Sequence, residues 1–316
     1  EAASAAAVVA RRAALLGGAI LAASPLIAAR PALADGTFKY KELPVSALTS
    51  SQRGAQKKEM QQRAEAELSK VLTYDDANDC VRLVIADVAD YDVKTKTGGF
   101  NGSIIKTGLP SDLKPIVTKL SQAKKAIDDG DTKNAGPISW PDLMYLAVRV
   151  SQRKGWATVK NARASDTASA SVIEQAYGNP WDVRMGRVES GDTGTGASAP
   201  AQGAPVSQIR DFLYNLGKTG DGGLFAAKPP LWERPAFVVW TAGAKDPAAE
   251  EARFAEADPI FADIKLDYDR SRRTVTRTNY EMDFAGFFDR LTSLGVKYNP
   301  EAYLYPEKVL DISKAL

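Results

Sequence analysis

Apolar residues recur along most of the chain at helical spacing. Between residues 53 and 72, Met60, Ala64, Leu68 and Leu72 follow one another at four-residue steps, with charged residues between them. This pattern is typical of an amphipathic helix that buries one face. The same periodicity, repeated in later segments, predicts a mainly α-helical protein.

Most of the other expected helices have recognisable ends. Asn78 or Asp79 can cap the segment DCVRLVIADVADY, and Ser111 can open a helix that carries Pro115 in its first turn. Ser139 can cap SWPDLMYLAVRVSQ, which Gly155 is expected to stop. Further helices are expected over residues 165–177, 206–216, 248–257 and 279–295.

Two stretches depart from the helical pattern. AFVVW, residues 236–240, is the best candidate for a short strand. Residues 189–207, ESGDTGTGASAPAQGAPVS, are rich in Gly, Ala, Ser and Pro and have little to bury, so we expect a flexible linker or loop. The linker separates two helical halves, residues 35–188 and residues 208–316.

The first 34 residues have the layout of an export signal. Arg11 and Arg12 precede an apolar run that ends in Ala32-Leu33-Ala34. This order predicts a twin-arginine signal that is cleaved after Ala34. We expect delivery to the chloroplast thylakoid lumen, with the bacterial periplasm as the alternative destination. A retained anchor is the alternative to cleavage; after cleavage the protein is expected to be peripheral to the membrane and not to span it.

Charge argues against one class of partner. The chain has 316 residues and a formal net charge of +2. Because residues 1–34 hold three arginines and one glutamate, the remainder carries 38 basic and 38 acidic residues. A neutral body has no bulk attraction for nucleic acid, so no nucleic-acid partner is expected, although local charged patches stay open.

The absence of histidine excludes several kinds of chemistry. No histidine occurs anywhere in the sequence, and Cys80 is the only cysteine. Ser-His-Asp and Cys-His catalysis, histidine metal sites and histidine-ligated haem are therefore ruled out by composition. We expect Cys80 to be a buried small residue, with a redox-active thiol as the alternative.

One glycine-rich stretch invites a phosphate-loop interpretation. TKTGGFNGS lacks the Gly-Lys-Ser/Thr ending of such loops and follows no clear strand. A structural turn is the favoured interpretation.

Three blocks resemble the ascorbate peroxidase family, the class I haem peroxidases. DVKTKTGGFNGSI, residues 92–104, is similar to the segment after that family's distal helix, and Arg82 stands where the family has its distal arginine. ISWPDLMYLA, residues 138–147, and GNPWDVRMGRVES, residues 178–190, resemble two further segments of the family. Beyond the linker the match thins, because the chain is shorter there. A thylakoid-lumen branch of ascorbate-peroxidase-like proteins is similar in this shortening and in the ending YNPEAYLYP.

The resemblance implies a haem-peroxidase-like helical fold, shortened in its proximal half and without haem. The family's distal tryptophan and histidine correspond to Ile85 and Ala86, and its proximal Gly-Gly-His to Gly243-Ala244 at best. Of the distal residues only Arg82 remains. We therefore expect no catalytic, cofactor-binding or metal-binding residues. Should the second half fill the haem space, Phe237, Trp240 and Phe261 are the bulky residues expected there.

The resemblance also implies a function. We expect a catalytically degenerate accessory protein associated with a thylakoid membrane protein complex, photosystem II. The alternative is a haem peroxidase or other oxidoreductase that acts on hydrogen peroxide and ascorbate. Its haem would need Cys80, Met185, Tyr303 or Tyr305 as ligand, or its redox chemistry would use Cys80. The aromatic segments 278–288 and 298–306 suggest either a docking surface or, as the favoured interpretation, packing onto the core.

Overall fold

The computed structural model describes most of the chain after the expected signal. The described residues are 39–106, 108–161, 166, 172, 181–191, 194, 198–201, 203–217, 233–242, 244–271 and 279–314. The expected signal over residues 1–34 and nearly all of the helix expected over residues 165–177 lie outside them. The chain divides into two units, of which Leu43–Glu307 is the larger.

The smaller unit is built around a two-stranded sheet. Strand β1, Tyr40–Leu43, pairs with strand β2, Glu307–Leu310. The amide of Asp311 donates to the carbonyl of Lys39, 2.7 Å away, and a short 3-10 helix, Ile312–Lys314, follows. The sheet thus joins two segments from opposite ends of the described chain.

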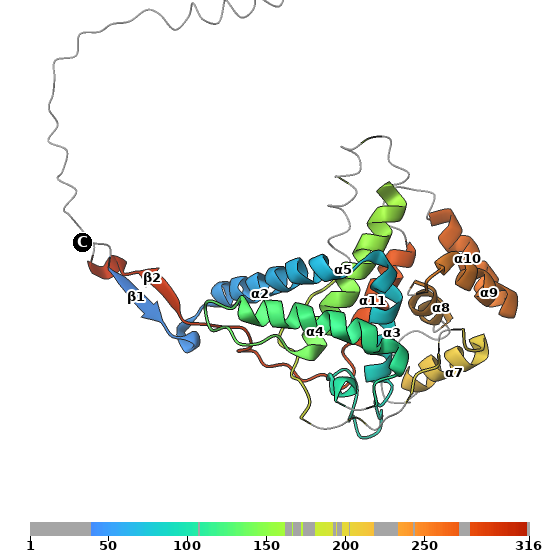
Figure 1. Cartoon of the computed structure of the whole chain (residues 1–316), viewed down its shortest axis with the longest axis horizontal. Helices are drawn as coiled ribbons and strands as arrows, with labels where there is room; N and C mark the ends of the chain where they lie inside the picture. The colour runs from blue at the N-terminus through green and yellow to red at the C-terminus, as the bar shows by residue number, and fades with distance from the viewer. Residues whose placement is uncertain are drawn as a thin grey trace, which may run out of the picture. The chain divides into compact units, whose positions relative to one another are not determined.

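The larger unit is helical, as the periodicity predicts (Figure 1). Among the described residues it contains nine α-helices: α2 (Ser50–Val71), α3 (Ala77–Val88), α4 (Lys114–Asp129), α5 (Trp140–Asn161), α7 (Val206–Gly217), α8 (Glu233–Ala242), α9 (Pro247–Ala257), α10 (Pro259–Ser271) and α11 (Asn279–Leu291). Four 3-10 helices, Val45–Ala47, Tyr74–Asp76, Ser103–Ile105 and Ser111–Leu113, connect them. Within the described segments, every helix is too short or too polar to cross a bilayer.

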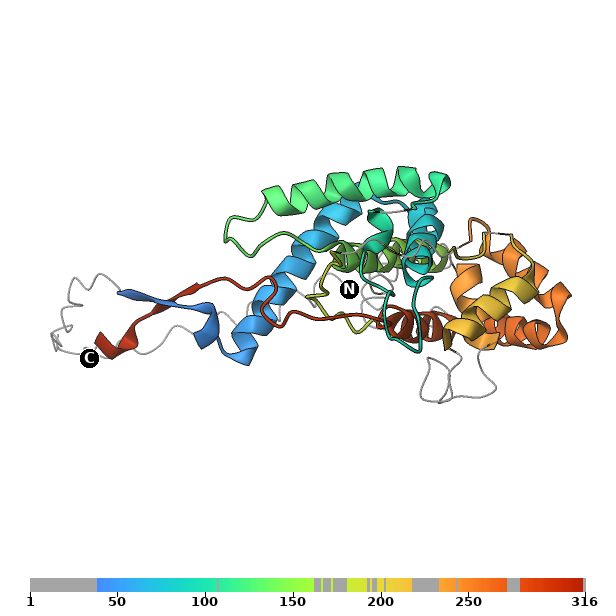
Figure 2. The same cartoon turned by 90° about the horizontal axis from the view of Figure 1, so that it is seen from below.

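Helix α5 is the centre of the first group of helices. It packs against α2 and α3, while α4 lies along α2 (Figure 2). Met60, Ala64 and Leu68 of α2 are buried, as their spacing predicts. The helix begins at Ser50, three residues earlier than expected, because Thr49 and Gln52 form a capping box across its first turn.

The later helices form a second group, in which α8 contacts α9, α10 and α11. Rings from all four helices are in contact: Phe237, Phe254, Phe261, Tyr268 and Tyr280. A second aromatic cluster joins α5 to α11 through Tyr145, Trp156, Trp181, Phe284 and Phe288. Helix α11 contributes to both clusters and so links the two groups.

The strand expected at residues 236–240 is wrong. These residues lie in α8, where Phe237, Val238, Val239 and Trp240 are all buried. A short, continuous apolar run suits a fully buried helix as well as a strand, so periodicity alone could not separate the two. Helix α10, Pro259–Ser271, is not among the helices that the sequence analysis predicts.

Two expected helix ends are wrong as well. Helix α3 begins at Ala77, so Asn78 and Asp79 lie inside its first turn, and Thr73 and Asp76 form a capping box one turn earlier. Helix α5 continues through Gly155 to Asn161. Gly155 serves packing instead: a Cβ there would lie 2.6 Å from a ring carbon of Tyr74. The missing side chain therefore lets the Tyr74 ring lie against α5.

The glycine stretch allows a prediction about stability. Gly99 and Gly136 have nearly equal positive φ angles, 89° and 88°. A Cβ on Gly99 would lie 2.4 Å from the carbonyl oxygen of Leu294, whereas a Cβ on Gly136 meets no described atom within 4 Å. We expect Gly136→Ala to cost about 1 kcal/mol of unfolding free energy and Gly99→Ala about 2–4 kcal/mol. Urea unfolding of both variants measures the difference; equal losses would contradict the close approach.

Candidate functional site

Helix α3 brings the three predicted distal positions to one small hollow. Arg82, Ile85 and Ala86 line a cavity of about 260 Å³. They do so because residues three and four apart share a helix face. The other lining residues are Ile104, Gly108, Pro110, Asp112, Leu113, Ser198, Ala199, Pro200, Ala201 and Trp240. No sequence pattern predicted that residues 198–201 would line the same hollow as α3.

Two carboxylates of the protein itself balance the charge of Arg82. Its guanidinium is 3.4 Å from a carboxylate oxygen of Asp79 and also hydrogen-bonds to Asp112. The bond from Arg82 is the main reason why the pKa of Asp112 lies below its usual range. A peroxidase arginine must be free to stabilise the negative charge that develops on peroxide oxygen. Arg82 instead forms ion pairs with the carboxylates of Asp79 and Asp112.

Trp240, from α8, is the one aromatic residue in the described lining of the hollow. Its side chain is 3% exposed and lines the cavity together with Ile85 and Ala86. Phe237 and Phe261, the other bulky residues expected there, lie instead in the aromatic cluster of α8–α11. Of the three, only Trp240 is among the described residues that line this hollow.

The residues of this hollow do not fit a haem. The described lining contains no histidine, cysteine, methionine or tyrosine, the side chains that ligate haem iron. The volume of about 260 Å³ is also below the roughly 300–1,000 Å³ typical of sites for drug-sized ligands. No reaction step through haem is therefore derived for this site.

The alternative haem ligands lie elsewhere. Tyr303 hydrogen-bonds to Asp142, Tyr305 hydrogen-bonds to Glu59, and Met185 is buried beside Trp181 at another cleft. Cys80 is 1% exposed on α3, and burial raises the pKa of its thiol to about 12, although a hydrogen bond with Ser151 acts in the opposite direction. A thiol with such a pKa stays protonated at neutral pH, which does not suit redox chemistry.

The glycine-rich stretch is a structural turn, as expected. Asp87, itself 1% exposed, accepts hydrogen bonds from the backbone amides of Asn101, Gly102 and Ile104 at 2.8–3.0 Å. Burial raises the pKa of Asp87 to about 6, and these three amides act against that rise. Because a carboxylate of the protein takes these amides, they are not offered to a phosphate.

A buried ion pair between Asp142 and Arg187 connects three distant segments. Asp142, in the first turn of α5, is fully buried and lies 3.0 Å from the Arg187 guanidinium. Its carboxylate also accepts from the amides of Gly186 and Arg187 and from the Tyr303 hydroxyl, at 2.6, 3.2 and 2.7 Å. Ser139 accepts from the Asp142 amide, 3.3 Å away, which confirms it as the cap of α5.

Aromatic rings complete the surroundings of Arg187. Its guanidinium carbon lies 4.2 Å from the centre of the Tyr145 ring and 5.6–5.8 Å from the Tyr298 and Phe100 rings, within the range of cation–π contacts. Sequence reasoning placed Asp142 at a helix start and Arg187 in a Gly-Arg segment. It did not bring the two together, because their separation of 45 residues has no periodic signature.

The aromatic residues near the end of the chain mostly pack inward. Tyr280, Phe284, Phe287, Phe288 and Tyr303 are all buried. Tyr305 is half-buried, and Tyr298 is 40% exposed. The packing interpretation is therefore confirmed over the docking interpretation for the buried residues.

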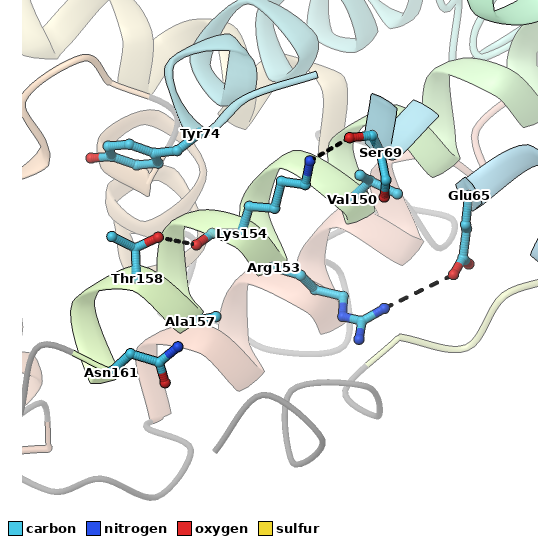
Figure 3. A pocket seen from close by; sticks show the side chains of 9 residues that line it. All are labelled: Glu65, Ser69, Tyr74, Val150, Arg153, Lys154, Ala157, Thr158 and Asn161. Carbon is cyan, nitrogen blue, oxygen red and sulfur yellow. Dashed lines mark hydrogen bonds and ion pairs between the residues drawn. The ribbon is translucent and has the colours of Figure 1, made fainter. Parts of the chain in front are cut away.

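A second hollow, of about 450 Å³, lies between α2 and α5 (Figure 3). Lys154 donates to the carbonyl oxygens of Ser69 and Leu72 at 2.7 and 2.8 Å, so its charge caps the C-terminal end of α2. Arg153 lies 3.9 Å from a Glu65 carboxylate oxygen. Because Lys154 and Arg153 both bind groups of α2, which forms one wall, we interpret the hollow as structural.

The sequence and the fold were compared with those of known proteins. No family model matches the chain. The thylakoid lumenal 29 kDa protein of Solanum lycopersicum is 31% identical over 244 residues, and that of Arabidopsis thaliana is 28% identical over 246. These matches cover 73% and 74% of this chain, and 66% of each relative. The crystal structure of the TL29 protein from Arabidopsis thaliana superposes with a TM-score of 0.67 at 26% identity, over 80% of this chain and 99% of that one.

The chain is a homologue of the thylakoid lumenal 29 kDa proteins. It spans about 66% of the length of these relatives. The homology confirms the expected localisation, the chloroplast thylakoid lumen. The mainly helical fold is likewise confirmed by its similarity to the 29 kDa protein's structure.

The buried ion pair yields a prediction. Asp142→Asn leaves the Arg187 guanidinium buried without a carboxylate and replaces an acceptor oxygen by an amide donor. We expect it to lower the unfolding free energy by about 3–5 kcal/mol in urea titrations. The matched control is Asp129→Asn, which removes the exposed partner of Lys125 and should leave stability within experimental error. Similar midpoints for both variants would show that the buried pair does not hold the fold.

Proposed function

We propose that this chain is a catalytically inactive protein on an ascorbate-peroxidase-like scaffold. It acts by binding a thylakoid membrane protein complex, and we propose photosystem II as that complex. The observation that carries the proposal is the hollow beside α3. Ala86, which by the resemblance corresponds to the family's distal histidine, lines this hollow together with Trp240.

The chemistry of peroxidases explains why this matters. A distal histidine moves a proton between the two peroxide oxygens, and removing such a general base commonly costs about 100- to 10,000-fold in rate. A second histidine must hold the iron. This chain has neither, and its remaining distal residue, Arg82, is paired with Asp79 and Asp112. The proposal therefore assigns the scaffold a role that needs no turnover.

The framework around the hollow supports a binding role. The Asp142–Arg187 pair and the two aromatic clusters hold the helices in one arrangement. A fixed arrangement keeps its outer surface in one shape, which lowers the entropic cost of binding a partner. In this proposal, residues 35–188 and 208–316 correspond to shortened distal and proximal halves of the scaffold, with residues 189–207 between them.

The inactive scaffold is tested by titration with haemin. We expect the purified mature chain to give no stoichiometric Soret band and no peroxide-dependent oxidation of ascorbate above free haemin, because no imidazole is present to bind the iron. Ala86→His serves as a sharper version, since it restores a distal imidazole alone and should remain inactive. A one-to-one haem complex with turnover in the unmodified chain would overturn the proposal.

The partner is tested by sedimentation. We expect the mature chain to sediment with photosystem-II-enriched membranes and to saturate, while protein-free vesicles of the same lipids retain markedly less. A series of salt concentrations separates specific docking from weak ionic attraction, which screening removes. Absence of saturable binding to the enriched membranes at every salt concentration would refute this partner.

A further inference from the structure

A cleft on the larger unit carries charges that neither the fold nor the proposed function uses. It has a volume of about 630 Å³ and lies among the N-terminal half of α2, the segment 181–185 and the segment 298–300. Its lining residues are Gly54, Lys57, Lys58, Gln61, Arg149, Trp181, Val183, Arg184, Met185, Tyr298, Asn299 and Pro300. The list contains four cationic side chains and, among the described lining, no carboxylate.

The four cations differ in how they are engaged. Arg149 is buried and pairs with Glu65, and Arg184 lies 3.6 Å from Asp182 at the surface. Lys57 and Lys58, by contrast, form no ion pair or hydrogen bond through their ammonium groups with any residue that the structure describes. Since Lys57 and Lys58 both line the cleft, two ammonium groups are available to it.

Of the two lysines, Lys57 gives the stronger indication of an anion site. It is half-buried, and burial lowers the pKa of its ammonium group, while the charge of Asp142 acts in the opposite direction. The Asp142 carboxylate already accepts from Arg187, Tyr303 and the Gly186 amide. A partly desolvated cation without a direct partner is unfavourable unless an anion reaches it.

Trp181, which lines the same cleft, has an indole N–H without a partner among the described residues. Its side chain is 6% exposed, and its indole nitrogen is buried with no acceptor among the described residues. Indole N–H can only donate, and buried donors normally have a partner. The ring is fixed by contacts with Trp156, Phe284 and Phe288, so the position of the donor is set before any ligand arrives.

We infer that this cleft binds an oxyanion group, with Lys57 and Lys58 as its cations and the Trp181 indole as a neutral hydrogen-bond donor. Phosphate, sulfonate and carboxylate groups share the chemistry that this set recognises. The group can belong to a soluble small molecule or to a lipid headgroup, and the test separates these sources. Residues 35–316 as a whole carry equal numbers of basic and acidic residues, so attraction for the anion arises from this local cluster and not from net charge.

Gly54 gives a direct way to close the site. It lies on α2 at the cleft, and a Cβ there would meet no described atom within 4 Å. Gly54→Glu therefore places a carboxylate beside the lysines without a clash against the described structure. Gly54→Ala is its matched control, because it makes the same backbone change and leaves the cleft open. Lys125→Gln, on α4, is the control for loss of one positive charge, as Lys125 does not line the cleft.

Two arms identify the source of the anion. In the first, inorganic phosphate is titrated into the purified mature chain by calorimetry; in the second, the chain is sedimented with phosphatidylglycerol or phosphatidylcholine vesicles. We expect saturable binding to phosphate or selectively to phosphatidylglycerol. Lys57→Gln and Gly54→Glu should weaken it by about 10-fold or more, as expected for loss of a charge-assisted hydrogen bond. The two controls should stay within about 2-fold of the unmodified chain.

Each outcome decides the inference. Binding in the first arm assigns the site to a soluble anion, and binding in the second arm alone assigns it to a headgroup, provided that the cleft variants lose it. Absence of saturable binding in both arms, or binding that Lys57→Gln and Gly54→Glu both retain, overturns the inference. Circular dichroism of each variant confirms that it is folded. Since no thylakoid complex is present, the result does not depend on the proposed partner.

Discussion

The buried ion pair between Asp142 and Arg187 is the constraint on which the larger unit depends. The Asp142 carboxylate accepts from four donors in two other segments: the Arg187 amide and guanidinium, the Gly186 amide and the Tyr303 hydroxyl. A buried charge with any of these donors displaced is costly, so the start of α5, the segment 181–189 and the segment 298–303 must keep one mutual arrangement. The cleft that Lys57 and Lys58 line borders two of these segments, through residues 181–185 and 298–300.

The hollow and the cleft differ in whether their polar groups have partners within the described protein. At α3, Arg82 is paired with the carboxylates of Asp79 and Asp112, and the hollow that Trp240 also lines has a volume of about 260 Å³. At the cleft, Lys57, Lys58 and the Trp181 indole have no such partners among the described residues. The open donors lie instead at the cleft, which is lined in part by two blocks that carry the resemblance, residues 178–190 and 298–306.

Sequence periodicity was sufficient for elements that bury one face. The helices α2, α4, α5 and α11 follow from apolar residues three and four apart, and Ser139 caps α5 as expected. It was insufficient where burial is uniform, because a short apolar run such as residues 236–240 suits a buried strand and a buried helix equally well. Gly155 was taken for a helix end because the ring of Tyr74, which needs that space, is distant in sequence. The distal residues could be placed together because one helix carries them, but the Asp142–Arg187 pair and the lysine cleft join residues from separate segments.

The Tyr303 hydroxyl bond to Asp142 has a consequence for how the chain reaches its native state. The two residues are 161 positions apart, so the bond closes a very long loop. Contacts of this separation slow folding, since the entropy of loop closure must be overcome before the contact contributes. During synthesis, the Asp142 carboxylate lacks the hydrogen bond from the Tyr303 hydroxyl until Tyr303 has emerged from the ribosome. Until then it cannot be fully enclosed, and the completed core is a late event of biogenesis.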